Sequence, residues 1–265
     1  MLDSKYQRFY DEIVKKIKKE KIFTDKLHTL AYGTDASFYR LIPKIVIKTD
    51  NAKEVQDIIE LSNSMNLSIT FRAAGTSLSG QAISDSILIV TSRNFSNFKI
   101  APDASFISLQ PALTGAQVNG LLAKYSKKIG PDPASINAAM IGGIAANNAS
   151  GMCCGISQNS YKTLKSMKLI FADGAKLDTG CQESKDAFRK THGDFLKELK
   201  NFSNDTKNNE ELRAKIERKF KIKNTCGYSL NALIDFEDEF EILEHLIIGS
   251  EGTLAFIEEI TYYTV

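Results

Sequence analysis

Two glycine-rich segments contain the residues whose types and spacing could bind a ligand. The first is RAAGTSLSGQA, residues 72–82, in which small residues alternate with hydroxyl side chains. Gly75 and Gly80 permit positive φ and a close approach of the backbone, so that consecutive amides can converge on an anion. The hydroxyls of the segment add further donors. A diphosphate fits that description, and an ordinary surface loop is the alternative.

The spacing of this segment argues against two common nucleotide sites. It is neither the dinucleotide fingerprint GxGxxG nor the phosphate loop GxxxxGK[ST], and no lysine follows Gly80. A nicotinamide-binding Rossmann domain and a P-loop enzyme are therefore disfavoured.

The second segment is GPDPASINAAMIGGIAANNASGMCCG, residues 130–155. Between Ile129 and Lys162 the chain has two of its five prolines, five of its sixteen glycines and no charged side chain except Asp132. Surface loops are normally solvated by charges, so an uncharged backbone of this length indicates that something flat and extended packs against it. A buried loop with small residues for tight packing is the alternative. Neither segment contains a histidine that could act as a general base.

A strand, a helix and a second strand precede the first segment and would position it. We expect strands over 44–48 and 68–72 and a helix over 51–66, where Asn51 and Glu54 form a capping box. The crossover length implies parallel pairing of the two strands. The first segment then follows the carboxyl end of a strand.

The rest of the chain predicts a mixed topology. The sequence SMKLIFADGAKLDT indicates a hairpin over 166–179, with its turn at Asp173-Gly174. We expect two helices, separated by the polar run SNDTK, as a surface insertion over 184–223. The other expected elements are an amphipathic helix over 1–20, strands over 86–90, 98–100 and 105–110, a helix over 114–128, a helix over 238–246 and a strand over 253–263.

Composition describes a globular chain of one large domain or two small ones. Of 265 residues, 43% are hydrophobic, and 34 Lys and Arg against 32 Asp and Glu leave a net charge of +2, so we expect no nucleic-acid partner. No apolar run is long enough for a transmembrane helix, and the charged amino terminus is unlike a signal peptide. We therefore expect a cytoplasmic location, with peripheral association at the inner face of the membrane as an alternative.

The cysteines predict neither a disulfide framework nor a metal site. Cys153, Cys154, Cys181 and Cys226 are few and irregularly spaced, and no histidine lies in a ligand spacing with them. We expect four free thiols and no metal. A cysteine nucleophile, which would need a histidine brought close by the fold, stays open.

Five segments together resemble one flavoprotein family. RAAGTSLSGQA resembles the pyrophosphate loop of the FAD domain of vanillyl-alcohol-oxidase-type (PCMH-type) flavoproteins, and GPDPAS with MIGGIAANNASG resembles their second flavin-binding stretch. The final 18 residues, IGSEGTLAFIEEITYYTV, resemble the end of such domains. TDASFYRLIP (34–43) and IKNTCGYSLNALIDF (222–236) are similar to segments of the D-2-hydroxyacid dehydrogenase branch, which acts on D-lactate, glycolate or D-2-hydroxyglutarate, especially its iron–sulfur-fused forms.

The resemblance implies an α+β fold of two subdomains with FAD between them. Residues 1–29 would be a helical lead-in and residues 30–265 the FAD-binding domain. Its first subdomain would extend to about residue 98 and its second over about 99–265, with the helical insertion over about 184–223. The substrate domain of the family would be absent, so that the chain would be one part of a longer protein and inactive alone.

The resemblance also implies a set of cofactor contacts and no catalytic residue. Around the pyrophosphate it places Ala74, Gly75, Thr76, Ser77, Ser79, Gly80 and Gln81, with Arg72 as a phosphate neighbour or structural ion-pair former. Along the ring system and ribityl chain it places Pro131, Asp132, Ser135, Gly142, Gly143, Asn148, Ser150 and Gly151. Near the adenine or pyrimidine side it places Gly155 and Ile156, and closing the pocket Glu251 and Gly252.

The expected function is FAD-dependent oxidation of a D-2-hydroxyacid. The resemblance implies hydride transfer to the flavin, with electrons passing to a quinone or to an iron–sulfur cluster in the absent part. The loop has Ala73-Ala74-Gly75-Thr76 where covalent relatives have a histidine, so FAD should be bound noncovalently; attachment through Cys153 or Cys154 is the alternative. The rival functions are a non-catalytic flavin-binding subunit and a nicotinamide-dependent flavin reductase.

Overall fold

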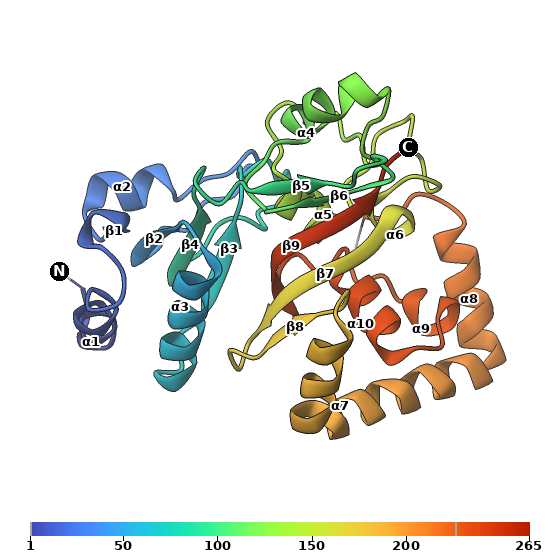
Figure 1. Cartoon of the computed structure of the whole chain (residues 1–265). Helices are drawn as coiled ribbons and strands as arrows, with labels where there is room; N and C mark the ends of the chain where they lie inside the picture. The colour runs from blue at the N-terminus through green and yellow to red at the C-terminus, as the bar shows by residue number, and fades with distance from the viewer. Residues whose placement is uncertain (1, 226) are drawn as a thin grey trace.

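Two β-sheets with helices packed around them make up the fold (Figure 1). The structure is a computed structural model and describes residues 2–225 and 227–265. Cys226, expected to be a free thiol, lies outside the described residues. The α+β class predicted from the sequence is confirmed.

The first sheet is formed by the N-terminal part of the chain. Its strands are β1 (Ile22–Phe23), β2 (Ile45–Thr49), β3 (Ile69–Arg72) and β4 (Ile87–Thr91). Their order is β1-β2-β4-β3, with β1 antiparallel to β2 and the other pairs parallel. The expected parallel direction of β2 and β3 is right, but β4 lies between them. Because β3 is at the edge, the segment after it leaves the sheet at its border.

Three helices and a short 3-10 turn accompany this sheet. They are α1 (Ser4–Ile13), the turn η1 (Lys19–Lys21), α2 (Lys26–Ala31) and α3 (Ala52–Ser64). Asn51 caps α3 by accepting the Glu54 N–H, while the Glu54 carboxylate accepts from Asp50 N–H instead of the expected Asn51. The helix expected over 1–20 is wrong in length: α1 ends at Ile13, and Ile17 is buried from the irregular segment that follows.

The second sheet is antiparallel throughout, with β9 at its centre. Its strands are β5 (Phe98–Ile100), β6 (Phe106–Leu109), β7 (Leu164–Phe171), β8 (Lys176–Asp178) and β9 (Ala255–Tyr263), in the order β5-β6-β9-β7-β8. The expected hairpin is present as β7 and β8, with Gly174 at φ +87° in its turn. Around this sheet lie α4 (Gly115–Leu122), the 3-10 turn η2 (Ala123–Tyr125), α5 (Ile141–Asn147), α6 (Ser160–Thr163) and α10 (Glu239–Ile247).

A helical arm flanks the second sheet on the side of β8 (Figure 1). It consists of α7 (Gln182–Asn208), α8 (Glu210–Phe220) and the short α9 (Ala232–Asp235). The break expected at SNDTK is wrong, because α7 continues through it and α8 begins after Asn209. Ser203 and Thr206 of that run are buried, and Ser203 Oγ donates to the Leu233 carbonyl at 2.6 Å. Polar residues here face a neighbouring helix instead of forming a loop.

The two sheets share a small apolar core. Val55 and Ile59 of α3 pack with Ile170 of β7 and Phe256 of β9. The rings of Phe71 on β3 and Phe256 on β9 lie 5.1 Å apart between centroids. The edge strand of the first sheet is thereby fixed against the central strand of the second, and the segment that follows β3 is held between them.

Candidate cofactor site

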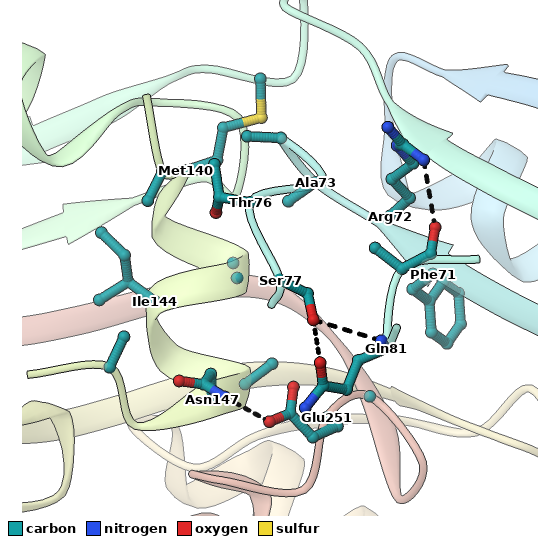
Figure 2. A pocket seen from close by; sticks show the side chains of 18 of the residues that line it. Phe71, Arg72, Ala73, Thr76, Ser77, Gln81, Met140, Ile144, Asn147 and Glu251 are labelled. Atoms are coloured by element: carbon teal, nitrogen blue, oxygen red, sulfur yellow. Dashed lines mark hydrogen bonds between the residues drawn. The ribbon is translucent and has the colours of Figure 1, made fainter. Parts of the chain in front are cut away.

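A cavity of about 600 Å³ lies between the two sheets. Its wall is formed by the loop after β3, by α5 and the residues that follow it, by Lys223, Thr225 and Gly227, and by residues 251–257 at the start of β9. Figure 2 shows the loop and α5 facing one another across this space. A cavity of this size and depth is typical of a small-molecule or cofactor site.

The loop after β3, residues 73–82, presents backbone donors to the cavity. Gly75 and Gly80 have φ values of +72° and +79°, conformations that side chains with a Cβ rarely adopt. The amide N–H groups of residues 74–78 have no acceptor among the described residues. Consecutive free amides in such a turn form a concave site for an anion.

Arg72 holds the base of this loop through one nitrogen of its guanidinium. Its Nη1 donates to the Thr34 carbonyl at 2.7 Å and to the Ala82 carbonyl at 3.3 Å. Gly75 lies against the guanidinium so closely that a Cβ there would be 2.4 Å from Nη2. Burial lowers the pKa of Arg72, with the charge of Asp35 opposing that shift. Arg72 therefore shapes the loop from behind.

A second contact closes the loop on itself. The Ser77 hydroxyl bonds the Gln81 side-chain carbonyl and accepts from the backbone N–H of Ser79 at 3.1 Å and of Gln81 at 3.3 Å (Figure 2). Arg72 at the start of the loop and the Ser77–Gln81 contact within it together fix the loop conformation. The loop amides are therefore oriented before a ligand binds.

Glycines keep the α5 wall flat where it meets neighbouring segments. A Cβ on Gly142 would lie 2.7 Å from Pro111 Cβ, and one on Gly143 would lie 3.5 Å from Ala73 Cβ. Ile144 of α5, Met140 and the start of β9 add apolar surface. A flat ring system fits against this part of the wall.

The end of α5 borders a polar part of the cavity. Asn147 donates to the Glu251 carboxyl, and Glu251 is held at φ +55°, an uncommon conformation for a residue other than glycine (Figure 2). Burial raises the pKa of Glu251, which favours its neutral form. Lys223 Nζ donates to the Ser150 carbonyl on the same side. The site therefore combines free amides, a flat apolar wall and a polar end, a combination that suits a ligand with a diphosphate and a planar ring.

Comparison with known families assigns the chain. The FAD binding domain family matches residues 43–180, which is more than half of the sequence and includes the loop, α5 and the β7–β8 hairpin. The chain belongs to the FAD-binding domain family. FAD has the diphosphate and the flat ring that the cavity suits.

Individual relatives agree with the branch predicted from the sequence motifs. The D-2-hydroxyglutarate dehydrogenase of Haemophilus influenzae is 26% identical over 90% of this chain and 24% of its own length. The D-lactate dehydrogenase of Archaeoglobus fulgidus is 24% identical over 82% of this chain and 38% of its own length. The chain therefore spans about a quarter to two fifths of these relatives. The structure of p-cresol methylhydroxylase with substrate bound superposes with a TM-score of 0.65 over 99% of this chain and 44% of that one, at 11% identity, which shows a shared fold.

Thirteen residues predicted as FAD contacts line the cavity. They come from all three predicted segments, which the fold brings to one place. They are Arg72, Ala74, Gly75, Thr76, Ser77, Ser79, Gln81, Ser135, Gly142, Gly143, Ser150, Glu251 and Gly252. Their contact with FAD stays a prediction.

Seven predicted contacts lie outside the lining: Gly80, Pro131, Asp132, Asn148, Gly151, Gly155 and Ile156. Several of them fasten the lining segments. Asp132 Oδ1 accepts from Gly151 N–H at 2.9 Å and from Cys154 N–H at 3.2 Å. Asn148 ends α5 at φ +51° and accepts from Tyr161 N–H. In this structure Asp132, Gly151 and Asn148 position the wall and do not line it.

The sequence reasoning missed other lining residues. Lys223 and Thr225 belong to IKNTCGYSLNALIDF, which was taken to indicate the branch and not the site. Asn147 lies next to the predicted Asn148, one position away on a helix that was not foreseen. The apolar part of the wall, including Phe71 and Phe256, could not be predicted from the sequence. Hydrophobic residues of a strand have the same sequence pattern whether they face a core or a cofactor.

Among the described residues, no cysteine or histidine lines the cavity. Cys153 is exposed and Cys154 is buried, both as free thiols, and neither lines the cavity. His28, His192 and His245 do not line it either. In the part of the chain that the structure describes, no cluster of His, Cys, Asp or Glu could hold a metal ion, and no helix is long and apolar enough to cross a membrane.

Proposed function

We propose that this chain is the FAD-binding part of a flavin-dependent dehydrogenase that oxidises a D-2-hydroxyacid to a 2-oxoacid. The observation that carries the proposal is the alignment of a D-2-hydroxyglutarate dehydrogenase with 90% of the chain. The free amides of residues 74–78 beside the flat α5 wall support a bound FAD. When bound, FAD would supply the acceptor for the hydride from the hydroxyacid.

The residues of this chain would bind and orient, and we assign no catalytic group among them. The loop amides would hold the diphosphate, while Ile144, Met140 and the start of β9 would pack against the ring. No histidine lines the described part of the cavity that could accept the substrate hydroxyl proton. Positioning a flavin beside its substrate is itself a large contribution, since correct orientation can remove roughly 7–11 kcal/mol from a barrier.

We further propose that FAD is bound noncovalently and that its electrons leave to a quinone or to an iron–sulfur region elsewhere in the protein. A quinone acceptor would bring the protein to the inner face of the cytoplasmic membrane, whereas an iron–sulfur acceptor would leave it in the cytoplasm. The loop offers no nucleophile for a covalent bond at residues 73–75, and Cys153 and Cys154 lie outside the lining.

Anaerobic addition of hydroxyacids to the full-length natural protein, loaded with FAD, tests this function. D-2-hydroxyglutarate, D-lactate or glycolate should bleach the oxidised flavin absorbance, and the L-enantiomers of the two chiral acids should not. Bleaching by NADPH but by no hydroxyacid would identify a flavin reductase instead. A bound flavin that neither reagent bleaches would indicate a non-catalytic flavin subunit. Acid precipitation should leave all flavin in the supernatant, whereas yellow pellets would contradict noncovalent binding.

A further inference from the structure

The charged side chains of the cavity wall differ in how many hydrogen bonds they make to other protein groups. Among the described residues the lining has three: Arg72, Lys223 and Glu251. Arg72 is tied to backbone carbonyls behind the loop, and Glu251 accepts from Asn147. Lys223 differs from both. Its ammonium makes one hydrogen bond, to the Ser150 carbonyl, and forms no ion pair with a carboxylate of the described chain.

The position of Lys223 places a positive charge at the polar end of the cavity. Ser150, its partner, lies just beyond the end of α5 at Asn147. Figure 2 shows Asn147 and Glu251 beside Ser77 and Gln81 of the loop. Lys223 and the loop with the free amides line the same cavity.

We propose that Lys223 is the cation that neutralises the diphosphate of bound FAD. Lys223 has this role only if the cavity holds FAD, as proposed above. The loop amides are neutral donors, so they orient a diphosphate without compensating its charge. In Arg72, the other cation of the lining, Nη1 already donates to the Thr34 carbonyl. An ammonium has three donors, of which Ser150 takes one, and it serves phosphates as a flexible point charge.

Ser150 gives Lys223 a defined place on an otherwise exposed rim. A lysine side chain without a partner would lose rotamer freedom on binding an anion, which reduces the gain. The bond to the Ser150 carbonyl fixes the side chain before the cofactor arrives. The other anion that could reach this rim is the carboxylate of the hydroxyacid. If Lys223 binds this carboxylate instead of the diphosphate, replacing Lys223 should leave the affinity for FAD unchanged.

Equilibrium titration of the apoprotein with FAD, at low and at high ionic strength, tests the role of Lys223. The variants are Lys223→Met, Lys223→Arg and, as a matched control, Lys219→Met on the exposed face of α8. We expect Lys223→Met to weaken FAD binding about ten-fold at low salt, as for loss of one charge-assisted hydrogen bond. The difference from wild type should shrink at high salt, because screening weakens a charge interaction and not a packing defect. Lys223→Arg should retain most of the affinity, and Lys219→Met should match wild type.

Each other outcome overturns the assignment of Lys223. An unchanged FAD affinity in Lys223→Met would show that the ammonium is a bystander or binds the substrate carboxylate. A loss of affinity that is independent of salt, or that Lys223→Arg shares, would show that Lys223 only fixes Ser150 and the wall. Failure of the wild type itself to bind FAD would contradict the proposed function and not this assignment alone.

Discussion

At the scale of single residues, Arg72 shows what the structure adds to a position that the sequence selects. The sequence places it beside the pyrophosphate loop as either a phosphate neighbour or a structural residue. Its bonds to the carbonyls of Thr34 and Ala82, and the close approach of Gly75, support the structural role, while a contact with phosphate stays a prediction. No local pattern could show this, because the partners at 34 and 82 are brought together only by the fold.

Replacing Arg72 by methionine should destabilise the protein and weaken FAD binding together. Loss of the charged donor to the Thr34 and Ala82 carbonyls should cost about 2 kcal/mol of unfolding free energy. The loop would also lose the group against which Gly75 packs. Urea unfolding measures the first effect and FAD titration the second, with Arg93→Met on the surface as the control. A stable variant with unchanged FAD affinity would show that the loop keeps its shape without Arg72.

Glu251 should make FAD binding sensitive to pH. Burial raises its pKa, so the carboxyl stays neutral to higher pH than an exposed one and ionises as the pH rises further. The ionised form, in the same cavity as the diphosphate, should weaken FAD binding by roughly five-fold. Lys223 and Arg72 also line this cavity.

The variant Glu251→Gln isolates this effect, because glutamine keeps the bond to Asn147 and does not titrate. Its FAD affinity should be constant where that of wild type falls. Glu258→Gln, outside the cavity, should follow wild type. A wild-type affinity that is flat from acid to neutral pH would show that Glu251 does not ionise near the cofactor.

At the scale of elements, sequence periodicity predicted most strands and the hairpin but not the pieces that shape the site. Helix α5 was not predicted because Gly142 and Gly143 have low helix propensity. Packing of Ile141 and Ile144 into the hydrophobic core beside the second sheet stabilises the helix. The SNDTK run was taken as a break because Ser, Asn and Asp favour turns in solution. Burial of Ser203 and Thr206 against α9 reverses that preference.

Helix α10 contains a buried acid whose titration should be visible in stability. Burial raises the pKa of Glu244 from 4.5 to about 7, with a bond to Thr179 opposing the shift. The folded state then holds its proton more tightly than the unfolded state. The unfolding free energy should therefore decrease as pH rises from 4.5 to about 7 and stay low above that, by up to about 3 kcal/mol.

Comparing wild type with Glu244→Gln by urea unfolding tests this element. The variant should gain stability relative to wild type as the pH rises through that window. Burial lowers the pKa of the neighbouring His245 to about 4, so both proteins lose stability toward acid. The His245 Nδ1 lies 3.9 Å from the Glu244 carboxyl. A difference that is constant with pH would show that Glu244 is ionised normally in the folded state.

At the scale of the molecule, two sheets of different topology pack against each other through one shared apolar core. Segments that follow or precede strands of both sheets line the cavity between them. The motifs at 72–82, 130–155 and 248–265 were recognised separately, and the fold brings their residues around a common space. The sequence could indicate that each segment binds a cofactor. It could not show which residues face that cofactor, since this depends on how the second sheet is placed against β3.

The central claim, that FAD lies between the loop and α5, is tested most directly by titrating the apoprotein with FAD beside the variant Gly143→Val. Gly143 lines the cavity beside Ala73, whose Cβ would lie 3.5 Å from a Cβ at position 143, and the extra methyl groups of a valine there would take up space in the cavity. We expect wild type to bind one FAD per chain and Gly143→Val, with the circular dichroism of wild type, to bind none at the same concentrations. Equal affinity in a folded Gly143→Val would contradict the claim and move the flavin elsewhere.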